Sequence, residues 1–485
     1  MINLKDILSG ADIISIKGSV GKLVGKISFD SRNIDDTSLF IAVKGTVSDG
    51  HDYINSAIEK GAVAIVCELI PENIIDDIAY IQVNNSAVAL GIIASNFYDN
   101  PTKKLKLIGV IGTNGKTTIA TLLYRTFKKL GYKTGLLSTI ENYIDNEKID
   151  ATHTTPDAIQ LNKLMHEMLE CGCDYCFMEV SSHSIHQHRI SGLKFKGGIF
   201  TNITHDHLDY HKTFKEYINA KKMFFDNLTD DAFALTNNDD KNGKIMMQNT
   251  RASKHTYSLK SMSDFKCKIL ESHFNGMLSV IDDKEIWLNF IGKFNAYNIL
   301  AVYSTAILLK QNNDEVLTVM SELKPITGRF EFISSKNNIT AIIDYAHTPD
   351  ALLNVLNTIR ELNTDNKQII TIIGAGGNRD KTKRPKMGKI AAEMSSKVIL
   401  TSDNPRNENP ETIIDEMYKG IDSKNLKKIL KITDRKEAIK TSFMLTNYGD
   451  IILLAGKGHE NYQEINGVKH HFDDKEEIMK LFNEN

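Results

Sequence analysis

Residues 109–118, GVIGTNGKTT, have the composition and order of a phosphate-binding loop. An apolar stretch enters the segment and an amphipathic one leaves it, which is the strand–loop–helix context that such a loop requires. Gly112 and Gly115 would let backbone N–H groups approach an anion at the positive end of the helix dipole. Lys116 would reach the β- and γ-phosphates of a nucleotide, and the Thr117 hydroxyl would face Mg²⁺.

The loop departs from the strict G-x4-G-K-[ST] pattern because Val110 stands at the first glycine position. The alternative interpretation is a tight strand-to-helix turn with an exposed lysine. The complete GKTT ending and its context favour the phosphate loop. Because kinases, switches, motors and ligases all use such a loop, it does not name a reaction.

Two further segments place carboxylates and histidines after apolar stretches. In residues 178–189, MEVSSHSIHQHR, Glu179 ends a predicted strand, where a metal-facing carboxylate belongs in this architecture. Residues 201–211, TNITHDHLDYH, follow another such strand and supply Asp206 and His207. This cluster favours a divalent cation held by nitrogen and oxygen ligands, although any single histidine could equally be a surface residue.

Three polar loops, residues 374–385, 401–410 and 455–463, each follow a predicted strand. They should gather at the carboxyl edge of one parallel sheet, which is where open α/β sheets bind ligands. Arg379 and Arg406 would each offer a planar fork suited to a carboxylate.

Asp403 and Glu460, in the same loops, could accept hydrogen bonds from an ammonium group. The loops therefore predict a site for an amino acid with a carboxylate and an ammonium at its far end. meso-Diaminopimelate has both groups, whereas lysine has only the amine. Lysine would leave Arg406 buried without its partner, a mismatch that can cost on the order of 10⁴-fold in specificity. In the alternative interpretation, Arg406 only pins its loop.

The elements that position these residues follow a βαβ rhythm, which implies parallel sheets. Composition breaks near residues 98–106 and 323–330 divide the 485-residue chain into three predicted α/β domains, 1–98, 99–326 and 327–485. The net charge of −2 gives no reason to expect nucleic acid or an anionic membrane as a partner. With no signal-peptide pattern and no apolar run of about 18 residues, we expect a cytoplasmic protein without membrane insertion. We interpret the five cysteines, three of which lie in CGCDYC, as structural residues and not as ligands of a zinc site.

Taken together, the motifs resemble those of the Mur ligases, ATP-dependent enzymes that add amino acids to the peptidoglycan precursor. The resemblance spans the chain and rests on GTNGKTT, MEVSSHSIHQHR, TNITHDHLDYH, GKFNAYN, GRFE and DYAHTPDAL. DSRNIDDTSLFIAVKG (30–45) and THTTPD (152–157) narrow it to members that extend UDP-N-acetylmuramoyl-L-alanyl-D-glutamate. DNPR accompanies diaminopimelate addition within the family.

The resemblance implies a central P-loop-type ATPase domain with a parallel sheet, an N-terminal UDP-sugar-binding α/β domain and a C-terminal Rossmann-like domain. It implies ATP and Mg²⁺ as cofactors and small molecules as the only substrates, and we expect a monomer. Lys221 and its neighbour Lys222 would on charge alone be solvated helix residues. Tyr217, Ala220 and Lys221 match the family's Y-x-x-A-K pattern, whose lysine is carbamylated and joins His207 at a second Mg²⁺.

The resemblance also carries roles onto individual positions. Phe294 and Asn378 depart from residues common in the family, without affecting these roles. The catalytic set is Lys116, Glu179, His207 and Lys221; the metal set is Thr117, Glu179, His207 and carbamylated Lys221. The ATP set is Gly112, Thr113, Asn114, Gly115, Lys116, Thr117, Thr118, Asn295, Asn298, Arg329 and Asp344. The UDP-sugar set is Ser31, Thr154, Thr155, Ser181, Gln187 and Arg189, and the amino-acid set is Arg379, Asp403, Asn404, Pro405, Arg406, Gly456 and Glu460.

These roles predict a ligase that transfers the γ-phosphoryl group of ATP to a carboxylate and then joins the acyl phosphate to an amine. The nearest alternative is the same ligase acting on L-lysine or another diamine. A more distant alternative is folylpolyglutamate synthetase, which has a similar ATP-binding domain but would not need the DNPR motif. A nucleotide-gated binding module without turnover is the alternative from another class.

Overall fold

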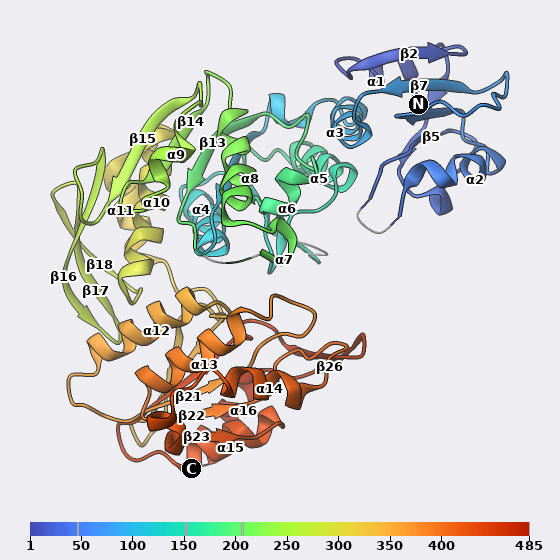
Figure 1. Ribbon diagram of the computed structural model, residues 1–485. Coiled ribbons are helices and arrows are strands. Elements are labelled where there is room, and N and C mark those ends of the chain that lie inside the picture. Colours follow the sequence, from blue (N-terminus) through green and yellow to red (C-terminus); the bar gives the residue numbers. More distant parts are fainter. Residues whose placement is uncertain (46–47, 151–153, 205, 207, 485) are drawn as a thin grey trace.

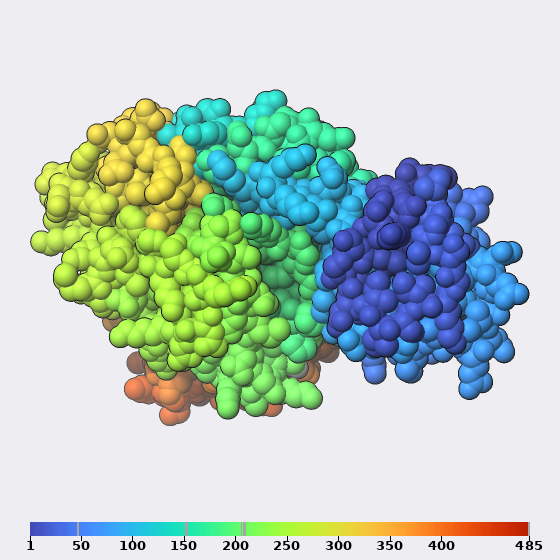
Figure 2. Space-filling model, turned by 90° about the horizontal axis from the view of Figure 1, so that it is seen from above, coloured from blue at the N-terminus to red at the C-terminus, as the bar shows by residue number. Residues whose placement is uncertain are grey.

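The computed structural model describes residues 1–485 apart from 46–47, 151–153, 205, 207 and 485. Three sheets, one after another along the chain, define what we call the N-terminal, central and C-terminal lobes (Figure 1). The C-terminal lobe lies below the central lobe in Figure 1, and the N-terminal lobe projects to one side, as Figure 2 also shows from above. The predicted α/β fold class is confirmed. Each sheet falls within one predicted domain, and the boundaries themselves stay predictions.

The N-terminal lobe is built on a five-stranded sheet in the order β2-β7-β6-β5-β4, parallel except for the edge strand β2. Apolar side chains cover both of its faces, as expected for a largely parallel sheet. Its elements are β1 Ile2–Asn3, α1 Leu4–Ile7, β2 Ile13–Lys17, β3 Leu23–Val24, β4 Lys26–Ser28, β5 Ser38–Ile41, α2 Ile54–Glu59, β6 Ala64–Cys67, β7 Ala79–Val83 and α3 Ser86–Phe97.

Helix α3 attaches this lobe firmly to the central one. A Cβ atom on Gly91 would lie 2.5 Å from the Ser191 carbonyl oxygen, and one on Gly192 would lie 2.7 Å from the Gly91 carbonyl oxygen. Ala158, the first residue of α5 (Ala158–Glu170) in the central lobe, belongs to the same apolar cluster as the inner face of the N-terminal sheet. The core of the N-terminal lobe therefore extends onto the start of α5.

The central sheet has eleven strands in the order β11-β10-β9-β12-β8-β13-β14-β15-β16-β17-β18. Strands β9 to β16 of that order run parallel, as predicted, whereas the antiparallel strands at both ends were not foreseen. The strands are β8 Lys106–Ile111, β9 Thr134–Leu137, β10 Asn142–Ile144, β11 Glu147–Ile149, β12 Tyr175–Glu179, β13 Phe195–Phe200, β14 Phe233–Asn237, β15 Ser253–Ser258, β16 Phe265–His273, β17 Gly276–Ile281 and β18 Lys284–Leu288. The other helices are α4 Lys116–Lys129, α6 Ser182–His186, α7 Leu208–His211, α8 Phe214–Asp226, α9 Gly243–Met246, α10 Lys293–Leu308 and α11 Asn313–Glu322.

The C-terminal sheet has the order β19-β20-β24-β21-β22-β23 and is parallel except for β19. A separate hairpin, β25–β26, follows β24. The elements are β19 Glu331–Ser334, β20 Thr340–Asp344, α12 Pro349–Leu362, β21 Ile369–Ile373, α13 Lys383–Met394, β22 Lys397–Leu400, α14 Pro410–Tyr418, β23 Ile429–Lys431, α15 Arg435–Met444, β24 Ile451–Ala455, β25 Tyr462–Ile465, β26 Val468–His471 and α16 Asp474–Glu484. Among the described residues, no helix has both the length and the apolar character needed to cross a membrane.

A fully buried ion pair fixes α15 to α16 behind this sheet. Arg435 donates from Nε and Nη2 to the two carboxylate oxygens of Asp474 at 2.7 and 2.6 Å. Nη2 also donates to the Ala455 carbonyl at the end of β24, at 3.1 Å. Since neither charge reaches water, each depends on the other for its stabilisation.

We predict that Asp474→Ala destabilises the C-terminal lobe by about 3–5 kcal/mol, because Arg435 would keep a buried charge without its partner. Glu476→Ala, in the same first turn of α16, removes only an exposed pair with His471 and should cost about 1 kcal/mol or less. Denaturant titration followed by circular dichroism measures both. Equal losses in the free energy of unfolding of the two variants would contradict the stabilising role of the Arg435–Asp474 pair.

Candidate active site

A cavity of about 1120 Å³ lies between the central and C-terminal lobes. Its central wall comprises the phosphate loop, the ends of β12 and β13, and the start of α10. Its opposite wall comprises residues that follow β20, β21, β22 and β24. The carboxyl ends of parallel strands thus face one another from two sheets.

Most residues predicted for the site line this cavity. All eleven predicted ATP residues do so, as do Lys221 and Glu179. Ser31, Gln187 and Pro405 do not line it, and His207 lies outside the described residues. The remaining lining residues from the substrate sets are Thr154, Thr155, Ser181, Arg189, Arg379, Asp403, Asn404, Arg406, Gly456 and Glu460.

The phosphate loop is shaped by close approaches at two glycines. Gly115 has φ +88°, and a Cβ atom there would lie 2.5 Å from Asn298 Oδ1 on α10. At Gly112 a Cβ atom would lie 1.8 Å from Thr201 Oγ1, just after β13. The loop is therefore packed too tightly for any side chain at either position.

Two lysines, the partly buried Lys116 and the buried Lys221, converge on this loop. Lys116 Nζ donates to the carbonyl oxygens of Gly112 and Thr113, at 3.0 and 2.8 Å. Lys221, on α8, donates to the same Gly112 carbonyl at 2.8 Å. Burial lowers the pKa of Lys116, while burial and then the Lys116 charge lower the pKa of Lys221. The negative charge of Asp206, buried nearby, raises both lysine pKa values and so opposes these shifts. With two amines beside it, the loop is suited to binding anionic oxygens.

Near the loop, Glu179 and Thr117 supply oxygen ligands of the kind that Mg²⁺ prefers. Glu179, almost fully buried, accepts from Thr139 N at 2.7 Å and from Thr139 Oγ1 at 3.1 Å. Thr117 Oγ1 accepts from Arg329 Nη2 at 3.2 Å. The described residues contain no group of three His, Cys, Asp or Glu side chains arranged to hold a metal. An ammonium at Lys221 would repel a cation, whereas a carbamate there would supply the missing anionic oxygens.

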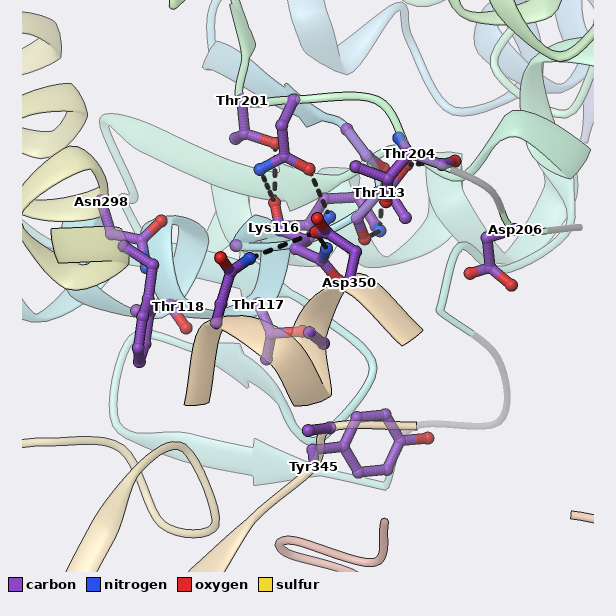
Figure 3. Close-up of a pocket in the computed structure, with 18 of the residues that line it drawn as sticks. Thr113, Lys116, Thr117, Thr118, Thr201, Thr204, Asp206, Asn298, Tyr345 and Asp350 are labelled. Carbon is purple, nitrogen blue, oxygen red and sulfur yellow. Dashed lines mark hydrogen bonds between the residues drawn. The ribbon is translucent and has the colours of Figure 1, made fainter. Parts of the chain in front are cut away.

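Side chains from the C-terminal lobe reach the phosphate loop. Asn114 Nδ2 donates to Asp350 Oδ2 at 3.0 Å, a contact drawn in Figure 3, and Asp350 lies at the start of α12. Arg329 lies over the Tyr345 ring, with its guanidinium carbon 4.5 Å from the ring centroid. Burial raises the pKa of Asp344 to about 6, against the opposing charge of Arg329. Sequence reasoning missed Asp350 and Tyr345, although both belong to the quoted DYAHTPDAL segment.

The nucleoside end of the cavity is organised by one carboxylate. Asp239 accepts from Tyr297 Oη at 2.8 Å and from the Leu259 and Lys260 N–H groups at 2.9 and 3.1 Å. It thereby ties α10, which carries Asn295 and Asn298, to the turn after β15. Asp239 and Tyr297 were also missed, because nothing in the local pattern separates Asp239 from an ordinary turn aspartate.

On the side of the cavity predicted to bind the UDP-sugar, hydrogen bonds orient Arg189. Its Nη1 donates to the Thr155 carbonyl at 2.9 Å, while Nε and Nη2 donate to Gln187 Oε1 at 3.0 and 2.6 Å. Gln187, which does not line the cavity, thus orients a residue that does. Thr155 Oγ1 in turn donates to the Glu179 carbonyl at 2.9 Å, which links this side to the metal side.

The side of the cavity predicted to bind the amino acid presents two acids beside an arginine. Asn404 Nδ2 donates to Glu460 Oε2 at 2.7 Å, and a Cβ atom on Gly456 would lie 2.6 Å from Asp403 Oδ2. Burial and then the neighbouring Asp403 raise the pKa of Glu460. The second carboxylate beside Glu460 makes this pair a suitable receptor for an ammonium group.

A buried arginine holds the two loops of this side together. Arg384, completely buried on α13, donates to both Glu408 oxygens at 2.9 and 3.0 Å, and to the Gly376 carbonyl at 3.1 Å. Glu408 belongs to the 401–410 loop, and Gly376 to the 374–385 loop. The sequence quoted both loops, but no spacing rule shows that these two residues meet.

Comparison with known proteins agrees with this arrangement. The chain matches the Mur ligase family catalytic domain over residues 24–98, the Mur ligase middle domain over 110–306 and the Mur ligase glutamate ligase domain over 328–458. It is 56% identical over 481 residues to the UDP-N-acetylmuramoyl-L-alanyl-D-glutamate--2,6-diaminopimelate ligase of Phocaeicola vulgatus, covering 99% of both chains. The chain belongs to the Mur ligase family.

Two further relatives of this Mur ligase carry the same name. The Cytophaga hutchinsonii enzyme is 57% identical over 481 residues, again covering 99% of both chains. A solved structure of such a ligase has a TM-score of 0.70 at 30% identity and covers 100% of this chain and 99% of its own. The family resemblance predicted from the motifs is therefore confirmed.

We predict that Lys221→Ala lowers ATP turnover by on the order of 10²-fold or more, because it removes the buried group at the phosphate loop. Lys222→Ala is the matched control: Lys222 pairs with Asp226 one turn along α8, at 2.6 Å, and does not line the cavity. It should retain activity within about twofold, since such helix pairs contribute only about 0.5 kcal/mol. Steady-state ADP release measures both, and equal loss in the two variants would contradict the prediction.

Proposed function

We propose that this chain joins meso-diaminopimelate to UDP-N-acetylmuramoyl-L-alanyl-D-glutamate at the expense of ATP, in cytoplasmic peptidoglycan precursor synthesis. The observation that carries the proposal is a single cavity lined by the phosphate loop, by Arg189 with Thr155, and by Arg406 with the Asp403–Glu460 pair. Three subsites suited to a nucleotide, an acidic acceptor and a diamino acid thus lie in one space. All of them come from one chain, which supports action as a monomer.

The first step would transfer the γ-phosphoryl group of ATP to the acceptor carboxylate. Lys116 and Arg329 would neutralise charge on the phosphates, with Asn295 and Asn298 near the adenine and Asp344 near the ribose. Thr117, Glu179, His207 and carbamylated Lys221 would hold Mg²⁺, which, when bound, would offset the charge that develops on the transferred group. Positioning and electrostatic stabilisation account for most of the catalysis in such a transfer.

The second step would bring the amine of diaminopimelate to the acyl phosphate. Asp403 and Glu460 would accept hydrogen bonds from the far ammonium group, and Arg406 would bind the far carboxylate. With that end held, the near amine attacks the acyl carbon, and the tetrahedral intermediate collapses to an amide and releases phosphate. Holding both reactants in one cavity makes the encounter effectively intramolecular.

The decisive test is ADP formation with UDP-N-acetylmuramoyl-L-alanyl-D-glutamate, offering meso-diaminopimelate and L-lysine separately. We expect only diaminopimelate to support turnover. We expect Arg406→Ala to lower the preference for diaminopimelate over lysine by on the order of 10³-fold. If lysine works as well, the ligase assignment stands with a different amino acid. If neither amino acid stimulates turnover, the acceptor assignment fails, and tight ATP binding alone would indicate a binding module.

We also expect the C-terminal lobe to close over the central lobe, because an acyl phosphate must be kept from water. The radius of gyration from small-angle scattering should decrease when the acceptor and a non-hydrolysable ATP analogue bind together. Identical scattering with and without both ligands would count against closure.

A further inference from the structure

Hairpin β25–β26 is joined to the loop that carries Arg406. The backbone N–H of Arg406 donates to the Glu464 carbonyl at 3.0 Å, and the N–H of Asn466 donates back to the Arg406 carbonyl at 2.8 Å. The N–H of Glu464 donates to Asn404 Oδ1 at 2.9 Å. The hairpin therefore acts as an added strand that fixes the backbone of this loop.

The side chain of Glu464 continues this connection. Its Oε2 lies 3.2 Å from Arg406 Nε, with both side chains about one-quarter exposed. Arg406 Nη1 donates to the Gly377 carbonyl at 2.9 Å. Arg406 also has φ +51°, a left-handed conformation that a non-glycine residue adopts only when its surroundings enforce it.

These contacts determine which part of the guanidinium faces a ligand. The carboxylate of Glu464 takes the Nε side, and the Gly377 carbonyl accepts one N–H of Nη1. Within the described part of the chain, Nη2 makes no hydrogen bond, and Arg406 lines the cavity. Because guanidinium has five N–H donors in a planar fork, its Nη1–Nη2 end can still bind a carboxylate through both nitrogens.

We propose that Glu464 is a positioning residue, which turns the Nη1–Nη2 end of Arg406 toward the distal carboxylate of the amino-acid substrate. This inference rests on the proposed function. Glu464 does not line the cavity, so it acts through Arg406 rather than on the substrate. Without it, the guanidinium could rotate about its long side chain, and its alignment with the carboxylate would be lost.

The test compares Glu464→Gln with wild type in ADP formation. We expect the KM for meso-diaminopimelate to rise about three- to tenfold, as for a partly exposed ion pair whose loss also frees a rotamer-rich side chain. The kcat and the KM values for ATP and the UDP-linked acceptor should stay within twofold. The preference for diaminopimelate over lysine should fall by the same factor as the KM rises.

Glu476→Gln is the matched control. It removes an exposed ion pair, at 2.9 Å, between Glu476 on α16 and His471 on β26 of the same hairpin. It should leave all KM values unchanged. In an Arg406→Lys background, Glu464→Gln should have less than a twofold further effect, because the group that it orients is gone. If the double variant falls below detection, the single-variant KM decides.

Three results would overturn the inference. A lower KM in Glu464→Gln would mean that Glu464 competes with the substrate carboxylate, and an unchanged KM would mean that Arg406 needs no orientation. An equal effect in the Arg406→Lys background would mean that Glu464 acts independently of Arg406. Wild-type protein that forms no ADP in response to diaminopimelate would instead refute the proposed function.

Discussion

Everything that lines the cavity depends on the direction of parallel strands. In the central and C-terminal sheets, the parallel strands that lead into cavity-lining residues all end at one edge of their sheet. These two edges face each other. The phosphate loop, Glu179 and Thr201 follow neighbouring strands of the first sheet. Asp344, Asp403 and Gly456 lie at or just beyond strand ends of the second. Neither sheet alone could present both a phosphate and an amino acid to a shared carboxylate.

The cavity brings ionisable groups of the same kind close together on each of its two walls. Lys116 and Lys221 share one carbonyl acceptor, and Asp403 and Glu460 lie together on the opposite wall. Buried like charges are costly unless an opposite charge arrives. Binding of anionic phosphates on one side and a cationic ammonium on the other would relieve both strains. The arrangement thereby favours ligands of the correct charge and disfavours uncharged analogues.

Much of this could be predicted from the sequence because the signals are local. A glycine-rich loop between an apolar strand and an amphipathic helix has few alternative structures, and the structure places this loop between β8 and α4. The loops after β21, β22 and β24 could be placed at one edge because parallel topology leaves no other arrangement. The antiparallel strands β16 to β18 have no comparable signature, since alternating polarity also fits an isolated hairpin.

What the sequence could not provide are contacts between distant segments. Arg384 meets Glu408, Asp350 meets Asn114, and Asp239 meets Tyr297 only after the chain has folded. Each pair joins two segments that no spacing rule connects. Gln187, which the resemblance assigns to the UDP-sugar set, accepts hydrogen bonds from Arg189 and does not line the cavity, so its substrate role stays a prediction.

The close packing of Gly91 against Ser191 and Gly192 joins the N-terminal lobe to the central lobe. Because this backbone contact and Ala158 connect the two lobes, we expect them to move together when the C-terminal lobe closes. A fluorophore attached at Met1 would consequently travel with the phosphate loop, whereas one placed on α16 would travel against it. The distance between two such labels would report lobe motion in single molecules, without any label near the chemistry.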